Sequence, residues 1–154
     1  MVTNNKLKQL NLNPLSVAKY FWEKGIEDMA ITQHLVYFTY LEAMKQGYLL
    51  FTEEWQAWPN GPAVESVFDK MFDYRHHLPK LFKPIKDIDN ELALNWAEKI
   101  FKKHQNTEQY LLFEKAQNKP WKDARKPLKS EKEITRIPLA NLIKFAANGR
   151  QIRT

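Results

Sequence analysis

The chain has four histidines, and two of them lie where a metal-binding face could form. His76 and His77 follow Asp69 and Asp73 on a helix expected after Pro62, on the side opposite its apolar stripe. Asp and His side chains on one face can bind a divalent metal. The same residues also suit the solvated face of an amphipathic helix, and the two histidines fall past its expected last turn. We therefore expect these side chains to be solvated and predict no metal site.

The other side chains that could carry out catalysis lack the spacing that catalysis requires. Ser16, Ser66 and Ser130 lie outside any Gly-x-Ser-x-Gly setting, and the four glycines are isolated, so no phosphate-binding loop is expected. The chain contains no cysteine, which excludes disulfides, thiolate metal sites and cysteine nucleophiles. His34 stands among apolar residues and is expected to be a hydrogen-bonded core histidine. These patterns predict a protein that is not an enzyme and takes no cofactor.

Basic residues are concentrated in the last quarter of the chain. Residues 119–154 contain ten Lys or Arg and three acidic residues, a net charge of +7, whereas residues 1–118 carry a net charge of −1. Such asymmetry favours an acidic partner: a nucleic acid, an anionic surface or an acidic protein. Basic groups beside an aromatic ring can bind phosphate and stack a base, and Trp121 is surrounded in the sequence by Lys119, Lys122, Arg125, Lys126, Lys129 and Lys132. The alternative is that Trp121 anchors the core and that its basic neighbours are solvated.

Helix start and stop signals divide a single domain into mainly helical elements. Asn13-Pro14 and Asp28 can each begin a helix, and Gly25 and Gly47 can end these two helices. The second helix, at about 28–46, is apolar nearly all round and is expected to be central. The predicted fold is mainly α, a compact domain of about six helices around this aromatic-rich helix. Further helices are expected at 62–72, 90–104, 107–116, 120–125 and 138–148, with Leu92, Trp96, Ile100, Tyr110, Leu111, Ala116, Leu139, Leu142, Ile143 and Ala146 directed inward.

Several other segments are expected to be non-helical. Residues 1–12 are polar and are predicted to be a flexible segment. Residues 78–89 contain two prolines and are predicted to form a loop. Tyr48–Phe51 and Trp55–Trp58 are short, aromatic-rich runs that suit either a small β-hairpin or an extended loop.

The segment Trp58-Pro-Asn-Gly-Pro62 is predicted to form a rigid turn, because each residue before a proline is driven away from helical geometry. Trp58 is expected to pack in the core, and Gly61 and Pro62 are expected to start the third helix. Truncating a buried aromatic side chain costs ~3–5 kcal/mol, so Trp58→Ala should destabilise the fold by that amount. Trp58, Gly61 and Pro62 together form a predicted structural motif.

The order of these features resembles the Panacea domain, an antitoxin family that includes SocA-like and phage-associated GepA-like proteins. Lys119-Pro-Trp-Lys-Asp-Ala-Arg125 is similar to the family's Gly-Pro-Trp-x-x-Ala-Arg segment. The likeness covers residues 14–147 and also includes Val17–Phe21, Leu35–Phe38, Gly47–Phe51, Glu54–Trp58, the Gly61-Pro62 turn and a final helix after an Ile-rich stretch. The chain departs from the family pattern at Ala30 and Gln33, where lysines are usual, at Ala63-Val-Glu65, where a second proline is usual, and at Lys119, which replaces a glycine.

The resemblance implies an antitoxin that neutralises a cognate toxin, encoded by an adjacent gene, by binding it directly. For SocA-like members it also implies an adaptor that delivers the toxin to a Clp-type protease. It places a Panacea-like domain at residues 13–149 and leaves residues 150–154 as a tail. We predict that Trp121, Lys122 and Arg125 contact the partner, because a basic, aromatic segment suits an acidic surface.

A cytoplasmic, soluble protein without membrane contacts is also expected. The longest uncharged run, Met29–Leu41, has 13 residues and is too short to span a bilayer as a helix. No apolar run near the first residues could serve as a secretion signal. The alternative function is that of a basic nucleic-acid-binding protein, although no recognition-helix or zinc-finger pattern is present. If nucleic acid is the partner, binding should weaken steeply with salt, but we expect only weak, sequence-independent binding to DNA or RNA that disappears near physiological salt.

Overall fold

Helices form most of the protein, whose computed structural model describes residues 7–153 and the side chains of residues 7–148. The prediction of a mainly α fold is confirmed, with eight helices in the described residues rather than about six. They are α1 (Pro14–Glu23), α2 (Met29–Lys45), α3 (Glu65–Asp73), α4 (Leu78–Phe82), α5 (Glu91–His104), α6 (Gln109–Ala116), α7 (Lys119–Arg125) and α8 (Leu139–Arg153). Within this described part of the chain, no helix has the length and apolar character needed to cross a membrane.

The first two helices begin where their capping residues predict. The Asn13 side chain accepts a hydrogen bond from the backbone N–H of Leu15 at 2.9 Å, and Asp28 accepts one from Ile31 at 2.9 Å. These contacts satisfy backbone N–H groups that have no partner within the first helical turn. Gly25 follows the end of α1 with φ +95°, a left-handed conformation that suits glycine.

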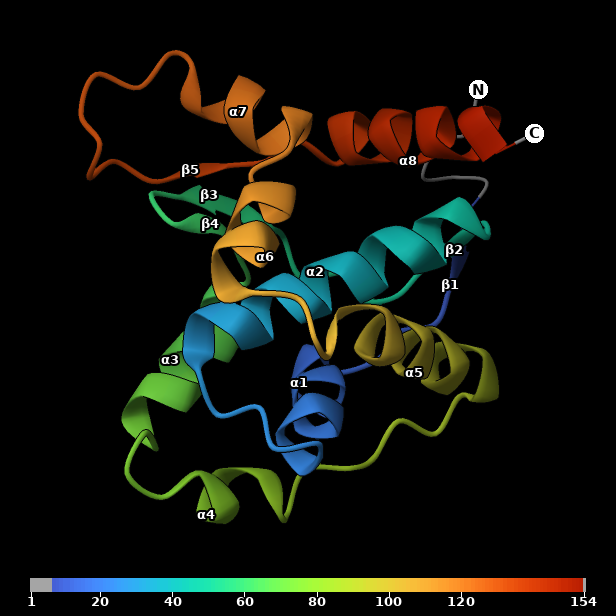
Figure 1. The fold of residues 1–154 in the computed structure, drawn as a ribbon, viewed down its shortest axis with the longest axis vertical. Helices are drawn as coiled ribbons and strands as arrows, with labels where there is room; N and C mark the ends of the chain where they lie inside the picture. The colour runs from blue at the N-terminus through green and yellow to red at the C-terminus, as the bar shows by residue number, and fades with distance from the viewer. Residues whose placement is uncertain (1–6, 154) are drawn as a thin grey trace.

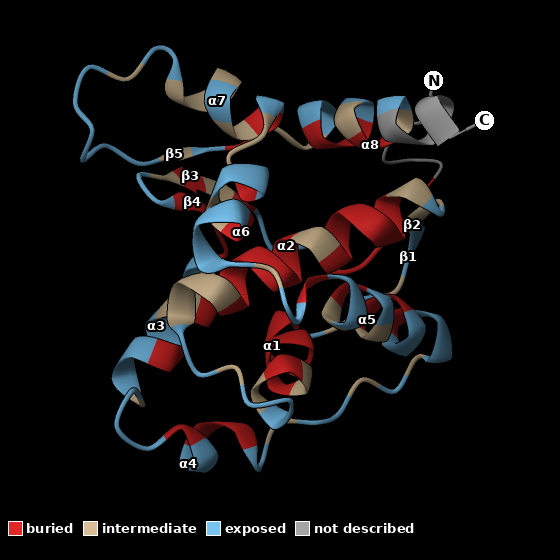
Figure 2. Ribbon diagram, viewed as in Figure 1, coloured by how far each residue is buried: buried red, intermediate tan, exposed pale blue. Residues whose placement is uncertain are grey.

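Helix α2 packs against α1, α5, α6 and α8, and buried residues follow most of its length (Figures 1 and 2). Beside it, four aromatic side chains form a cluster that is almost fully buried. The Trp55 ring lies 4.9 Å from Tyr37 and 5.7 Å from Tyr40, measured between ring centroids, and Phe51 lies 5.1 Å from Tyr40. Edge-to-face and tilted pairs at these separations are favourable in addition to the apolar area that they bury.

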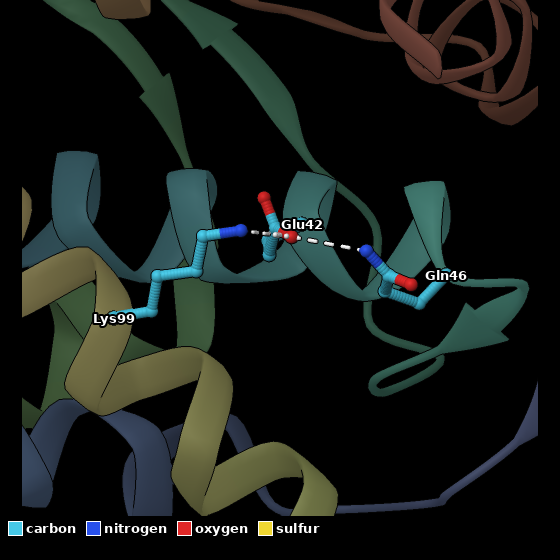
Figure 3. A network of polar contacts seen from close by, with 3 residues as sticks. All are labelled: Glu42, Gln46 and Lys99. Carbon is cyan, nitrogen blue, oxygen red and sulfur yellow. Dashed lines mark hydrogen bonds and ion pairs between the residues drawn. The ribbon is translucent and has the colours of Figure 1, made fainter. Parts of the chain in front are cut away.

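A charged contact lies on the buried side of α2. Glu42, whose side chain is 4% exposed, accepts hydrogen bonds from Lys99 of α5 at 3.0 Å and from Gln46 at 3.2 Å (Figure 3). Burial by itself raises the pKa of Glu42, but the hydrogen bonds and the nearby lysine charges outweigh it and hold that pKa below its usual value. The carboxylate is therefore ionised at neutral pH and linked to a second helix.

We expect Lys99→Met to lower the free energy of unfolding by about 1–3 kcal/mol, because it leaves a buried carboxylate without its charged donor. The lowered pKa of Glu42 means that this contribution is present above the ordinary Glu pKa and is lost as the pH falls through the folded-state value. Urea denaturation at pH 7 measures the loss. The difference in the free energy of unfolding between the variant and the parent should become smaller in acid. Lys80→Met, at an exposed position on α4, is the control, and an equal loss there would contradict the prediction.

In the part of the chain that the structure describes, five short strands form two small sheets. Strand β1 (Lys8–Gln9) pairs in parallel with β2 (Tyr48–Leu49). In the second sheet β3 (Gln56–Trp58) lies between β4 (Gly61–Ala63) and β5 (Thr135–Arg136), antiparallel to both. The hairpin is thus β3–β4, so the alternative of a hairpin between 48–51 and 55–58 is wrong.

The ends of the chain differ from the sequence prediction. Residues 8 and 9 of the predicted flexible segment belong to β1, and Leu7 is buried, because residues 8–12 hydrogen-bond along the chain that follows α2. Residues 1–6 of that segment lie outside the described residues. Gly149 does not end the last helix, since α8 continues to Arg153 through most of the predicted tail. The side chains of Arg150 and Arg153 are outside the described residues.

Two further predictions about helices were wrong: one helix was missed, and the start of another was misplaced. The predicted loop at 78–89 contains α4, because Pro79 sits in its first turn, where a missing N–H costs nothing, and Leu78 and Phe82 are buried. Helix α3 begins at Glu65 rather than at Pro62, because Gly61–Ala63 pair with β3.

Three predicted core residues are instead exposed. Leu92 is 44% exposed, Tyr110 63% and Leu111 36%, whereas Leu112 is buried on α6. The inward face of α6 is formed by Leu112 and Ala116, so Ala116 is buried as predicted, whereas Tyr110 and Leu111 are not.

Candidate protein-interaction site

The predicted partner-binding residues on α7 are partly used by the fold itself. Trp121 is half-buried, and its indole N–H donates to the backbone carbonyl of Trp58 at 2.8 Å. This bond ties α7 to the end of β3. Lys122, the next residue, is exposed.

The Arg125 guanidinium binds backbone oxygens from two separate segments. It donates to the carbonyls of Ala57 at 2.7 Å, Glu133 at 2.8 Å and Glu131 at 3.0 Å. Its planar arrangement of donors suits several acceptors at once. Arg125 therefore connects β3 to the loop between α7 and β5, which Figure 1 shows projecting from the body of the protein.

Arg125→Lys is expected to lower the free energy of unfolding by about 2 kcal/mol, because one ammonium group cannot serve carbonyls of two segments in this geometry. The loop should loosen first, so amide hydrogen exchange at 131–136 should speed up in the variant. Lys122→Met, which alters an exposed neighbour, should leave both stability and exchange unchanged. If the amides of residues 131–136 exchange at the same rate in Arg125→Lys and in the parent, the hydrogen bonds from Arg125 do not stabilise the loop.

A pocket of about 210 Å³ lies between α2, the β3–β4 hairpin and α3; we call it the hairpin pocket. Its walls include Ala30 and His34 of α2, Gly61 and Ala63 of the hairpin, and Phe68 of α3. The elements are held in place by the carboxamide of another wall residue, Gln33. Its nitrogen donates to the carbonyl of Val64 and its oxygen accepts from the Val64 N–H, both at 3.0 Å. This pair of hydrogen bonds fixes the end of β4 against α2.

Gly61 brings the hairpin into direct contact with His34. A Cβ atom at position 61 would lie 2.7 Å from Cε1 of His34, and Gly61 has φ +139°, which other residues rarely adopt. The sequence prediction that Gly61 is structural agrees with this geometry, although its role is to admit His34 rather than to start α3.

His34 is buried as predicted but lacks the predicted hydrogen bonds. Its side chain is 2% exposed, neither ring nitrogen has a hydrogen-bond partner among the described residues, and its ring lies 4.6 Å from that of Phe113. Burial lowers the pKa of His34 to about 4, and the nearby Asp28 carboxylate only partly opposes the shift. The imidazole is therefore neutral at pH 7.

Aromatic side chains continue from the hairpin pocket onto the surface of α3 and form what we call the aromatic ridge: Trp58, Phe68 and Phe72. Trp58 is half-buried, so its predicted place in the core is wrong, and its ring meets Phe68 edge-on at 4.8 Å. Phe68 stacks on Phe72 at 5.7 Å, and Phe72 is 44% exposed. The Arg75 guanidinium lies 4.2 Å from the centre of the Phe72 ring.

The ridge was missed at the sequence level because Phe68 and Phe72 share the helical spacing of the buried residues Val67 and Met71. Spacing identifies an apolar face but does not show how far its neighbours cover it. The only signal of the ridge in the sequence was the width of the apolar stripe on this short helix.

The surface around the ridge is rich in carboxylates. Glu65, Asp69 and Asp73 are exposed on α3, as is Asp28 at the start of α2, and these four carboxylates outnumber the exposed cationic groups beside the ridge, Lys70 and Arg75. His76 and His77 are also exposed. Within the described residues, no group of three or more His, Asp or Glu side chains is arranged to hold a metal ion.

The pocket and the ridge provide apolar contact area with charged side chains around it. Comparison with known proteins gives no relative: no protein-family model, no curated protein and no solved structure matches the chain.

Proposed function

We propose that this protein is an antitoxin that neutralises a cognate toxin by direct protein–protein binding. The aromatic ridge is the observation that carries the proposal. Exposed Phe72, half-buried Trp58 and the stacked Arg75 are of the residue types that concentrate binding energy in protein interfaces. The resemblance to the Panacea domain supports the same function.

Three of the four departures from the family pattern support this location, and the fourth, Lys119, lies on α7. Ala30 and Gln33 stand where lysines are usual, and Ala63 begins the segment that lacks the second proline. All three residues line the hairpin pocket. A surface that differs from the family pattern at one pocket fits recognition of a toxin particular to this chain.

The proposal includes a Panacea-like domain at 13–149 organised around α2, action in the cytoplasm, and no enzymatic activity of its own. Delivery of the bound toxin to a Clp-type protease is an additional role that the SocA-like resemblance supports. Lys122 extends the surface available to a partner, whereas Trp121 and Arg125 can contribute only through the groups that the fold leaves unused.

The test is co-expression with the product of the adjacent gene. We expect that product to arrest growth alone, growth to resume when this protein is present, and the two proteins to co-purify as a stable complex. Toxicity unchanged by co-expression, or failure of the two products to bind, would overturn the proposal.

A second candidate, weak nucleic-acid binding, is favoured by the exposed lysines of α7 and the loop that follows it. These are Lys119, Lys122, Lys126, Lys129 and Lys132. Lys119 and Lys126 both pair with Asp123, at 3.0 and 3.4 Å, and the Trp121 indole is half-buried, which reduces what is available for phosphate and for stacking. We expect binding to RNA or DNA that disappears near physiological salt; sub-micromolar, sequence-selective binding there would make this the primary function.

A further inference from the structure

The hairpin pocket has the size of a single large side chain. Its volume is about 210 Å³, whereas sites for drug-sized ligands are usually ~300–1,000 Å³. The wall residues Ala30, Ala63, Trp58 and Phe68 are apolar, and the Gln33 carboxamide is already bonded to Val64. An apolar group therefore fits the pocket without leaving a charge unpaired.

The pocket and the aromatic ridge form one continuous surface. Trp58 and Phe68 belong to both, and the ridge continues through Phe72 to Arg75. An occupant that filled the pocket would thus also meet Phe72. A small molecule confined to the pocket would leave that ring uncovered, whereas a polypeptide segment would cover it.

The charge of the surround indicates the chemistry of that segment. Glu65 and Asp69 share a face of α3 with Phe68 and Phe72, since these residues are three or four positions apart. Asp28 adds a carboxylate on the α2 side of the pocket, where it is close enough to His34 to raise the pKa of the imidazole. A complementary segment carries basic residues beside its apolar anchor.

We propose that a basic segment of a partner protein docks on the aromatic ridge and inserts one large aromatic side chain into the hairpin pocket. The inference rests on the proposed protein-binding function and adds the surface and the chemistry of the partner. The volume of the pocket, about 210 Å³, favours a large aromatic side chain as the anchor over a smaller apolar one. The carboxylates on α3 pair with the basic residues around the anchor.

The first arm of the test uses the full chain and the product of the adjacent gene, with affinity measured by titration calorimetry. Phe72→Ala should weaken binding at least tenfold, as truncation of an interface anchor does. Leu92→Ala removes a side chain with the same 44% exposure on α5 and should change affinity less than twofold. The double variant Glu65→Gln and Asp69→Asn should weaken binding and reduce its dependence on salt, and Glu91→Gln is its control.

The second arm uses a synthetic, amidated peptide with one Trp among lysines, followed by amide shifts of the ¹⁵N-labelled full chain. We expect the peptide to shift Ala30, Gly61 and Phe72, and counterparts with Trp→Ala or Lys→Glu to lose the effect. Shifts confined to the α7–β5 loop, or equal binding of the Trp→Ala peptide, would overturn the inference.

The two arms separate this inference from the proposed function. If the gene product binds Phe72→Ala as tightly as the parent, the docking surface is wrong while the antitoxin function stands. If the gene product does not bind at all, the antitoxin function fails and the peptide alone decides the docking surface. Loss of binding by Phe72→Ala counts only when the variant unfolds at the same urea concentration as the parent.

Discussion

Trp55→Ala is expected to lower the free energy of unfolding by about 3–5 kcal/mol, the range for truncation of a buried aromatic side chain. Trp55 is 1% exposed and contacts the rings of Tyr37, Tyr40 and Phe51. These neighbours belong to α2 and to the chain that follows it, so the cavity left by the indole cannot close without moving α2. Urea denaturation measures the loss as a lower midpoint with an unchanged slope.

Trp58→Ala is the matched control, three residues along the same chain. Trp58 is half-buried and loses mainly its contact with Phe68 and the bond from its indole N–H to Gln56 at 2.7 Å. Its truncation should cost clearly less than that of Trp55. Equal losses in the two variants would contradict the assignment of Trp55 to the core and Trp58 to the ridge.

The second large effect is a loss of stability in mild acid. Burial lowers the pKa of His34 to about 4 and that of His104 to about 4, in the latter case with help from the charges of Lys115 and Lys103. Because both pKa values are lower in the folded than in the unfolded protein, the unfolded chain binds more protons between pH 6.5 and 4. Stability is therefore full above pH 6.5 and falls as the pH drops toward 4. Protonation of His34 alone accounts for about 3 kcal/mol of the free energy of unfolding that is lost between pH 6.5 and pH 4.

Urea denaturation at half-unit steps from pH 7.5 to pH 4 tests this expectation. His34→Leu replaces the imidazole with an apolar side chain of similar size and should flatten the pH profile, leaving the part due to His104. His76→Gln changes an exposed histidine and should leave the profile as it is in the parent. A flat profile in the parent, or an unchanged profile in His34→Leu, would show that His34 does not titrate as proposed.

Local chemistry explains which parts of the fold could be predicted. Asn13, Asp28 and Asn90 cap helices through hydrogen bonds to backbone N–H groups two or three residues away, so the signal lies within a single turn. Strand β1 could not be foreseen in this way. It consists of two residues paired with Tyr48 and Leu49, about forty positions along the chain, and two residues carry no alternation of polarity.

In the candidate site, too, local features could be predicted from the sequence, whereas contacts between distant parts of the chain could not. A basic, aromatic segment was correctly found at α7, but the sequence does not show that the Arg125 donors reach carbonyls near positions 57 and 131–133. The ridge depends on how far α3 is covered by neighbouring elements, which is a property of the packed protein. His34 was placed in the core correctly, but its lack of hydrogen bonds depends on the hairpin that packs against it.

The contact between Gly61 and His34 also limits the order in which the two positions can change during evolution. A side chain at position 61 meets the imidazole before it meets anything else, and φ +139° is a backbone conformation that other residues rarely adopt. Such a side chain is tolerated only after position 34 has become smaller and the turn has changed its conformation. Loss of the imidazole first costs packing but creates no clash. Homologous sequences should therefore contain glycine with histidine or glycine with a small residue, and a larger residue at 61 only in lineages that had already lost the histidine.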